Sequence, residues 1–161
     1  MFDSEYLDIT NKIFENNEFK KLKYEVHHIN SNRLDHSICV SKKTYKVCKK
    51  FNLDYKSATK AALLHDFFFD DEFFNKKDQM LNHPKKAVEN SLKITDLTDK
   101  EINIIESHMY PIGKKLPKYK ESVIVNAIDD YVSIKERVSL DYAYFKTAVS
   151  FLIIVLINII Y

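Results

Sequence analysis

The chain has 161 residues, of which 45% are hydrophobic and 30% charged, and its formal net charge is +2. This charge balance lacks the basic footprint of a nucleic-acid binder and disfavours nucleic acid as an obligate partner. One Gly and three Pro leave little material for hairpin turns, which disfavours a β-sandwich or barrel. The length and the abundance of helix-forming residues predict a single all-α domain.

Two amphipathic helices are predicted in the first third of the chain. The first covers residues 4–17, and we expect it to pack as a brace over the core. The second covers residues 33–51, where His36 shares the apolar stripe of Val40 and therefore faces the interior. Arg33 lies one turn before His36, so it could grip a phosphate by bidentate hydrogen bonds, although a surface salt bridge explains it equally well.

Cys39 and Cys48 lie nine residues apart on the second predicted helix. Nine steps of about 100° place two residues on opposite faces of a helix, so these thiols cannot form a disulfide with each other. The mixed polar and charged residues 1–10 do not resemble a signal peptide. We therefore expect two buried thiols and a cytoplasmic protein.

A tightly packed core helix is predicted over residues 54–64, with Asp54 as its N-cap and alanines that allow close approach of its neighbours. His65 and Asp66 follow this apolar run directly. Burying an imidazole and a carboxylate without partners is costly, so the two either bond to each other or share a metal ion. The aromatic and acidic residues 67–82 then predict an irregular segment at the mouth of a cleft.

Two further histidines occupy places where helices are expected to pack. His83 precedes Pro84, and Pro at a first helical position predicts that a helix begins here with His83 facing inward. Thr98 and Glu101 form a capping box at the start of the next helix. His108 lies on the apolar stripe of that helix, so it is also predicted to face the core.

A basic loop connects this helix to the next one. It covers residues 109–120 and contains Lys114, Lys115 and Lys118. Because the loop follows an inward-facing histidine, these lysines could contact the phosphate of a substrate. The alternative is that they are ordinary exposed lysines.

The last predicted amphipathic helix covers residues 121–138. Asp129 lies on its apolar stripe with Val125 and Val132, whereas Asp130 is turned by about 100° toward solvent. A buried carboxylate requires a cation. Asp129 therefore joins the side chains that are expected to meet in the interior.

Six ligand-type side chains are predicted to converge on one interior: His36, His65, Asp66, His83, His108 and Asp129. Each of them alone has an ordinary structural explanation. Burying all six together would carry a large desolvation cost, which two metal ions would offset. Helix faces alone leave a metal site and a hydrogen-bonded polar core as about equal alternatives.

The order of these six residues resembles the HD-domain metal-dependent phosphohydrolase superfamily, in its variant with two extra histidines and a dinuclear centre. The segments NRLDHSICVS, AALLHDFFFDD, HPKKAVEN and IIESHMYPI resemble those of small bacterial HD-domain proteins. The resemblance covers residues 27–137 and implies an all-α bundle with the site in its centre. It implies one metal held by His36, His65, Asp66 and Asp129, and a second held by Asp66, His83 and His108.

The resemblance also implies an activity. It implies hydrolysis of a phosphomonoester or phosphodiester by a metal-activated hydroxide, with His65 and Asp66 as catalytic residues. The segment IDDYVSI resembles the final aspartate segment of HD enzymes that cleave bis(nucleosyl) tetraphosphates, so the expected substrate is a nucleotide or nucleotide polyphosphate. Phe67 follows Asp66 where cyclic di-GMP phosphodiesterases continue with Gly-Lys, so that substrate is not expected. The donors suit one or two ions of Fe, Mn, Co, Ni or Zn without selecting among them.

The single domain 1–161 is expected to comprise a brace over 1–26, an HD core over 27–137 and a hydrophobic C-terminal helix over 138–161. Residues 148–161 would span only about 21 Å as a helix, short of the roughly 30 Å hydrocarbon core of a bilayer. We expect this segment to pack on the domain or on a second copy of the chain, with attachment to a membrane surface as the alternative. The competing hypothesis is a metal-containing scaffold without catalysis, joined to a partner or membrane through this segment.

Overall fold

The computed structural model describes residues 3–28 and 31–138. The elements in chain order are α1 (Ser4–Glu15), α2 (Asn17–Lys20), the 3-10 helix η1 (Lys21–Tyr24), β1 (Val26–His28), β2 (Ser31–Asn32), α3 (Arg33–Lys50), α4 (Tyr55–Leu64), the 3-10 helix η2 (Asp70–Glu72), α5 (Lys76–Leu92), α6 (Asp99–Ser107) and a helix over residues 120–138. β1 and β2 pair antiparallel as a short hairpin, and all other regular elements of the described ranges are helical. The predicted all-α fold is confirmed.

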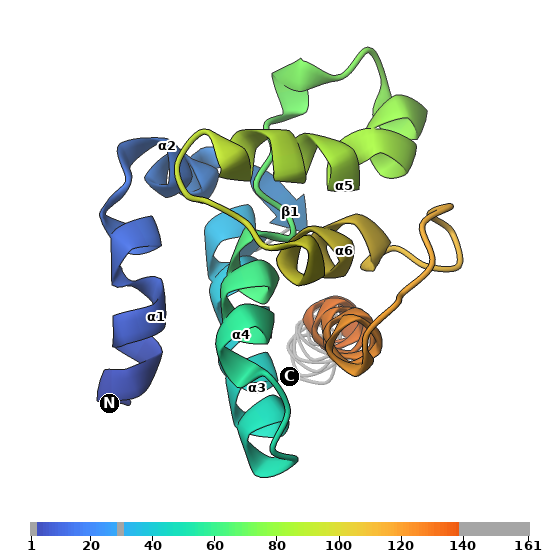
Figure 1. The fold of residues 1–161 in the computed structure, drawn as a ribbon. Coiled ribbons are helices and arrows are strands. Elements are labelled where there is room, and N and C mark those ends of the chain that lie inside the picture. The colour runs from blue at the N-terminus through green and yellow to red at the C-terminus, as the bar shows by residue number, and fades with distance from the viewer. Residues whose placement is uncertain (1–2, 29–30, 139–161) are drawn as a thin grey trace, which may run out of the picture.

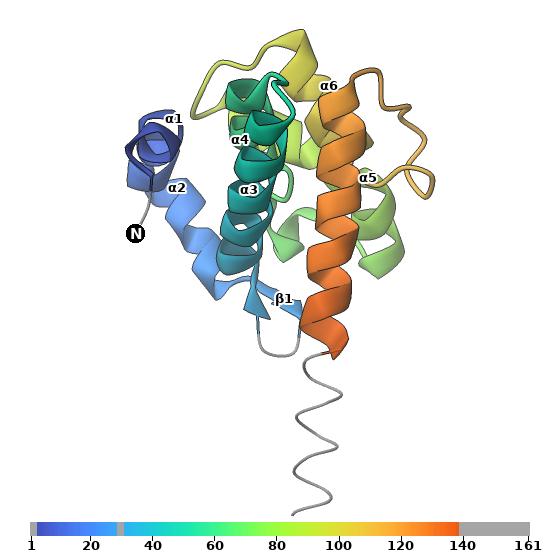
Figure 2. The same ribbon diagram turned by 90° about the horizontal axis from the view of Figure 1, so that it is seen from below.

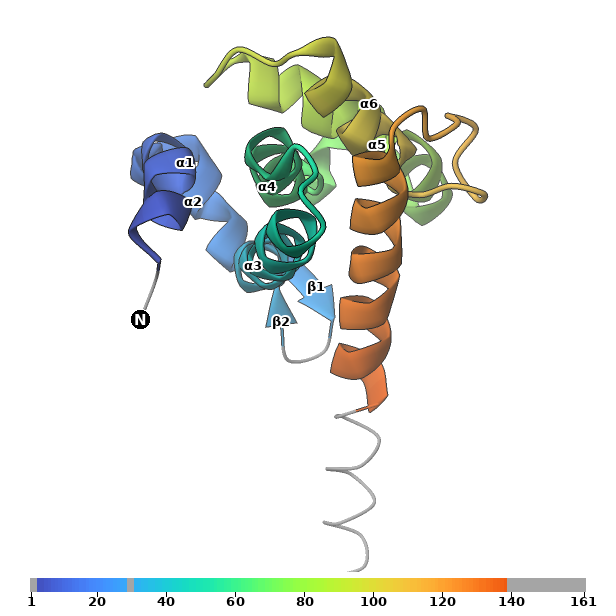
Figure 3. The same cartoon turned by 60° about the horizontal axis from the view of Figure 1, so that its bottom comes forward.

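The helices are arranged around α3 and α4, which lie side by side in the middle of the molecule (Figure 1). α1 covers one side of this pair, and the 120–138 helix lies along the opposite side (Figure 2). α5 and α6 lie across one end of the pair (Figure 1). The hairpin of β1 and β2 lies near the far end of the 120–138 helix (Figure 3). Because α4 contacts α1, α3, α5 and α6, it is the central helix of the fold.

α4 packs closely because its inner residues are small or aliphatic. Ala58, Ala61 and Ala62 have no exposed surface, and neither do Leu63 and Leu64. The alanines let neighbouring helices come near, and each fully buried leucine contributes about 2 kcal/mol by removing apolar surface from water. The end of this helix is therefore held firmly at the centre of the molecule.

Polar caps start two of the helices that carry the predicted site. Asp54 accepts a hydrogen bond from the backbone N–H of Ser57 at 3.1 Å, which confirms it as the N-cap of α4. The capping box of α6 is confirmed as well. Thr98 Oγ1 accepts from the N–H of Glu101 at 3.2 Å, and the Glu101 carboxylate accepts from the N–H of Thr98 at 2.8 Å.

The predicted start of α5 at Pro84 is wrong. The helix begins at Lys76 because Asn75 caps it, its side-chain oxygen accepting from a backbone N–H of the first turn at 2.9 Å. Residues 76–82, predicted to be irregular, therefore belong to the helix. Pro84 lies in the helix interior, where it removes one backbone donor. His83 still lies on the buried face, as predicted.

The N-terminal elements cover the outer side of the central pair. Tyr6 and Ile13 of α1 are buried, and the Tyr6 hydroxyl donates to Ser41 Oγ of α3 at 3.3 Å. Phe19 of α2 has no exposed surface and meets the ring of Phe67 edge-on, with ring centroids 5.3 Å apart. These contacts support both α3 and the segment that follows α4.

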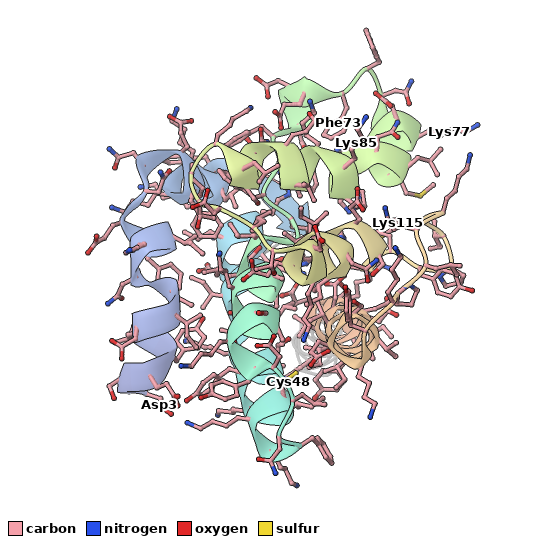
Figure 4. All side chains as sticks on the ribbon, in the orientation of Figure 1. Asp3, Cys48, Phe73, Lys77, Lys85 and Lys115 are labelled. Carbon is pink, nitrogen blue, oxygen red and sulfur yellow. The ribbon has the colours of Figure 1, made fainter. Side chains whose placement is uncertain are left out.

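Both cysteines are free thiols. Cys48 is buried as expected, whereas Cys39 is only half-buried, so the expectation of two buried thiols is wrong for Cys39. Figure 4 shows Cys48 within the helices rather than at the edge of the molecule. Burial raises the pKa of the Cys48 thiol to about 11, so this group stays protonated and unreactive at neutral pH.

The predicted C-terminal helix over 138–161 lies outside the described residues. Within 3–28 and 31–138, no helix combines the length and apolar character needed to cross a lipid bilayer.

We expect Thr98→Ala to lower the free energy of unfolding by about 1 kcal/mol, because α6 loses the hydroxyl that caps its first turn. Thr98→Ser keeps the hydroxyl and is the matched control, expected within about 0.5 kcal/mol of the wild type. Urea denaturation followed by circular dichroism measures both. Unchanged stability of Thr98→Ala would show that this cap does not secure α6.

Candidate metal centre

The structure brings all six predicted ligand side chains together in the middle of the bundle. They are His36 of α3, His65 at the end of α4, Asp66 after it, His83 of α5, His108 at the end of α6, and Asp129 of the 120–138 helix. None has more than 8% of its surface exposed. Their nitrogen and oxygen atoms form three groups that could hold a metal ion, with the atoms of each group within 4.8 Å of one another.

One half of the cluster is gathered around Asp129. Its Oδ1 lies 2.8 Å from Nε2 of His36 and 3.4 Å from Nε2 of His65. Oδ2 of Asp66 lies 3.7 Å from the same His65 nitrogen. Two imidazoles and two carboxylates therefore surround one small volume between α3, α4 and the 120–138 helix.

The other half is gathered around Asp66. Its Oδ1 lies 3.5 Å from Nε2 of His83 and 3.5 Å from Nε2 of His108. Asp66 thus presents a different carboxylate oxygen to each half of the cluster. A carboxylate in this position is suited to bridge a pair of metal ions.

Hydrogen bonds on the far side of three imidazoles fix the orientation of the rings. Nδ1 of each ring bonds to a backbone carbonyl of its own segment: His65 to Ala62 at 2.8 Å, His83 to Gln79 at 2.9 Å, and His108 to Ile105 at 2.7 Å. A carbonyl only accepts, so Nδ1 must carry the proton and the Nε2 lone pair is left for the centre. Metal-binding histidines are commonly held in this way.

Two features of the cluster would destabilise the folded protein if no cation were bound. Nε2 of His65 is buried and has no hydrogen-bond partner among the described residues. Nε2 atoms of His83 and His108 lie 3.0 Å apart, and because Nδ1 of each ring bonds to a carbonyl, one ring must carry a second proton for these two atoms to form a hydrogen bond. An unpartnered buried polar atom costs about 1–3 kcal/mol. Because bound cations would remove both penalties, the residues present fit a metal centre.

Burial and charge shift the proton equilibria of the histidines. Burial lowers the pKa of His36, but hydrogen bonds to Asp129 and Glu136 outweigh it and raise the pKa to about 10. Burial lowers the pKa of His83 to about 4, against the opposing attraction of Asp66. At neutral pH His83 is therefore neutral, whereas His36 carries a second proton that a bound ion would displace.

Both central carboxylates are ionised. Burial raises the pKa of Asp66 and of Asp129, but the neighbouring His65 and other imidazoles outweigh it, and both pKa values lie well below the usual range. The centre therefore holds two negative charges in a place that is shielded from water. Such charges are stable only with positive partners.

Glu136 also belongs to the site, and it is not among the six ligand-type residues predicted from the sequence. Its two carboxylate oxygens each lie 3.3 Å from Nδ1 of His36. It follows Asp129 by seven residues in the same helix, so both carboxylates lie on the face directed toward α3. A search for acidic residues at this spacing from each candidate ligand could have found it.

Arg33, a candidate phosphate ligand, forms salt bridges within the protein, but it is buried and not at the surface as the salt-bridge alternative expected. Its guanidinium donates to Glu25 at 3.1 Å, to Asp70 at 2.9 Å and to the carbonyl of Phe68 at 2.9 Å. It also stacks on the Phe68 ring, 3.8 Å from the ring centroid. These bonds hold the segment after Asp66 against the start of α3, so Arg33 helps to position Asp66.

The candidate phosphate-binding lysines of the basic loop are not brought to the histidines. Lys114 and Lys115 line a separate hollow, in which Lys115 Nζ lies 2.6 Å from a carboxylate oxygen of Glu106. Lys118 is exposed, and its backbone N–H bonds to the side chain of Asn103 in α6 at 2.9 Å. Figure 4 shows Lys115 on the loop at the outer edge of the molecule. The bond to Asn103 anchors the Lys118 end of this loop to α6, whereas Met109 and Ile112 at its start line the cleft beside the cluster.

A cleft of about 460 Å³ leads to the cluster. Ligand side chains that line it are Asp66, His83, His108 and Asp129. The other lining residues include apolar side chains, namely Phe68, Met80, Met109, Ile112 and Ile134, and the cations Arg33, Lys76 and Arg137. A molecule in this cleft would therefore meet both halves of the candidate metal centre.

The fold and the site define an all-α protein that buries a two-part histidine and carboxylate cluster at the end of an open cleft. The family model described as HD domain matches residues 33–133, a range that contains all six ligand-type residues, and the chain belongs to this family. HD domains are in general metal-dependent hydrolases that bind divalent ions, and the predicted family is confirmed. No curated protein and no solved structure matches the chain.

We expect Arg33→Lys to lower the free energy of unfolding by about 2 kcal/mol, because one ammonium cannot replace the forked bonds to Glu25, Asp70 and the Phe68 carbonyl. Lys43→Arg, on the same helix but outside these contacts, is the control. Chemical denaturation measures the difference. An unchanged free energy of unfolding for Arg33→Lys would show that the guanidinium does not hold this segment.

We expect the chelator-treated protein to take up about two Mn²⁺ ions per chain. Its Tm should rise by about 5–10 °C, because the ions bind the buried imidazole nitrogens and carboxylates of the native state. Asp66→Asn removes the carboxylate shared by both halves and should abolish the shift. Asp71→Asn, an exposed aspartate of the same segment, should retain it. Scanning fluorimetry and elemental analysis measure Tm and metal content. A wild type that takes up no metal would refute the assignment of the centre.

Proposed function

We propose that the protein is a metal-dependent phosphohydrolase that cleaves phosphate esters in the cleft beside the six-residue cluster. The placement of Asp66 supports this most directly. Its oxygens face two separate sets of imidazoles, at 3.7 Å from His65 on one side and at 3.5 Å from His83 and His108 on the other. Two adjacent cation positions that share a carboxylate are suited to phosphate-ester hydrolysis.

The six residues would bind two ions between them. One divalent ion, of Fe, Mn, Co, Ni or Zn, would be held by His36, His65, Asp66 and Asp129, and a second by Asp66, His83 and His108. Bound there, such ions lower the pKa of water and neutralise charge on phosphoryl oxygens. The protein keeps the donors rigid, through the carbonyl bonds at Nδ1 and the Arg33 contacts that fix the segment after Asp66.

The cleft suits a substrate that combines phosphate with a flat or apolar group. Phe68, Met80 and Ile134 offer carbon surface, whereas Lys76 and Arg137 offer positive charge. Its volume of about 460 Å³ lies within the range of small-molecule sites. A nucleotide or nucleotide polyphosphate is the substrate class that we propose, with the base against the apolar wall and the phosphates toward the cluster. Lys114, Lys115 and Lys118 have no part in this arrangement.

The cellular setting is part of the same proposal. Free thiols suit a reducing compartment, so we place the protein in the cytoplasm. We also propose that residues 148–161 pair with a second copy of the chain or contact a membrane surface. These residues lie outside the described ranges.

Hydrolysis assays with Mn²⁺ test the activity. The substrates are bis(p-nitrophenyl) phosphate, p-nitrophenyl phosphate and a panel of nucleotides and dinucleoside polyphosphates. Asp66→Asn should lower kcat/KM by at least about 100-fold, because loss of a ligand costs more than loss of a residue that only orients one. The matched variant Asp71→Asn should stay within about threefold of the wild type. Bound metal without turnover of any substrate would favour the scaffold hypothesis.

A further inference from the structure

His36 differs from the other three histidines of the cluster in the hydrogen-bond partner of its Nδ1 atom. Carbonyls of their own segments hold the other three, so the orientation of those rings comes with the local backbone. Nδ1 of His36 instead meets both carboxylate oxygens of Glu136, at 3.3 Å each, from 100 residues away in the sequence. The orientation of this ring therefore depends on how the 120–138 helix packs against α3.

Glu136 and Asp129 hold His36 from opposite sides of the ring. Asp129 Oδ1 lies 2.8 Å from Nε2, and Glu136 lies at Nδ1. The two carboxylates are about two turns apart on one face of one helix. Because a carboxylate only accepts hydrogen bonds, Glu136 keeps the proton on Nδ1 when Nε2 binds an ion.

Glu136 is itself anchored. The hydroxyl of Ser31 in β2 donates to its Oε2 at 3.2 Å, so the hairpin helps to hold the carboxylate in place. Only 21% of the Glu136 side chain is exposed, whereas the His36 side chain is fully buried. Both Ser31 and Glu136 lie outside the residues 33–133 matched by the family. The family match therefore says nothing about this contact.

The two halves of the cluster differ in their carboxylates. The half around Asp129 has two carboxylates as donors and Glu136 behind His36. Among the described residues, the group that joins His83 and His108 contains one carboxylate, that of the shared Asp66, although His108 also groups with His65 and Asp129. More negative charge and a firmly oriented ring both strengthen the binding of a divalent cation.

We propose that Glu136 is a positioning residue that orients His36 and makes the half around Asp129 the tighter of two metal positions. The inference rests on the metal centre of the proposed function. Residues that orient metal-binding histidines typically change metal affinity by about 10–100-fold when they are replaced. Glu136 accordingly contributes, together with the second carboxylate of this half, to the order in which the two positions fill.

Titration of the full chain with Mn²⁺ tests this. The wild type should show two classes of site. Glu136→Gln removes the charge at nearly constant shape and should weaken the tighter class by about 10–100-fold while leaving the weaker class unchanged. His83→Ala should instead remove the weaker class. Glu89→Gln, an exposed glutamate of α5, is the matched control and should change neither.

A spectroscopic measurement separates orientation from general stability. In the Zn²⁺-loaded protein, the ring N–H proton of His36 should resonate far downfield because it is bonded to a carboxylate, and it should move upfield in Glu136→Gln. The ring protons of His65, His83 and His108 should not move. If Glu136 had a purely structural role, Glu136→Gln would lower Tm but would not shift the His36 resonance selectively.

The outcomes are distinct. Unchanged Mn²⁺ affinity and an unchanged His36 resonance in Glu136→Gln would overturn the positioning role and leave the metal centre intact. No metal uptake by the wild type would overturn the proposed function itself. If Glu136→Gln does not fold, Glu136→Asp carries the test, since it keeps the charge but shortens the reach. Its tighter class should weaken by an intermediate factor, and equality with the wild type would reject the proposal.

Discussion

The burial of two ionised carboxylates, Asp66 and Asp129, is the constraint on which the rest of the structure depends. A buried carboxylate without partners would cost several kcal/mol, of the order of the stability of a whole domain. Here four imidazoles surround the pair, and they lower both carboxylate pKa values against the effect of burial. Each helix around the centre supplies an imidazole, a carboxylate or a bond that orients one. The hydrophobic packing of α4 and the polar chemistry of the site therefore stabilise the same arrangement.

The convergence of the six ligand-type side chains could be predicted because helical spacing and helix caps are local properties. The 3.6-residue period places His36 and Asp129 on apolar faces, and the capping box at Thr98 fixes the helix that ends at His108. The start of α5 is not predictable from Pro84 alone, because the chain contains two start signals. Pro84 suggests a beginning, but Asn75 caps the helix one residue before Lys76, and a buried helix can accommodate one missing donor.

The surroundings of the cluster could not be predicted, because they depend on contacts between segments far apart in the chain. Sequence reasoning left Arg33 open between a phosphate ligand and a salt bridge, and its partners Glu25 and Asp70 lie in other segments. The path of the basic loop is set by Asn103 of α6, which no local pattern indicates. Glu136 was missed for the opposite reason. Its spacing from a predicted ligand was readable, but a glutamate near the end of an amphipathic helix usually faces water.

His36 and Asp129 are 93 residues apart, and this separation bears on how the chain comes together. A growing polypeptide that has reached His108 already contains every imidazole of the cluster but only one of its two central carboxylates. The last described helix then delivers Asp129 and Glu136 to a surface rich in imidazole nitrogen. The contacts of these two carboxylates with His36 add an electrostatic contribution to the apolar burial between the 120–138 helix and α3. The cation pocket is complete only when the 120–138 helix is packed against α3, because both carboxylates that contact His36 come from this helix.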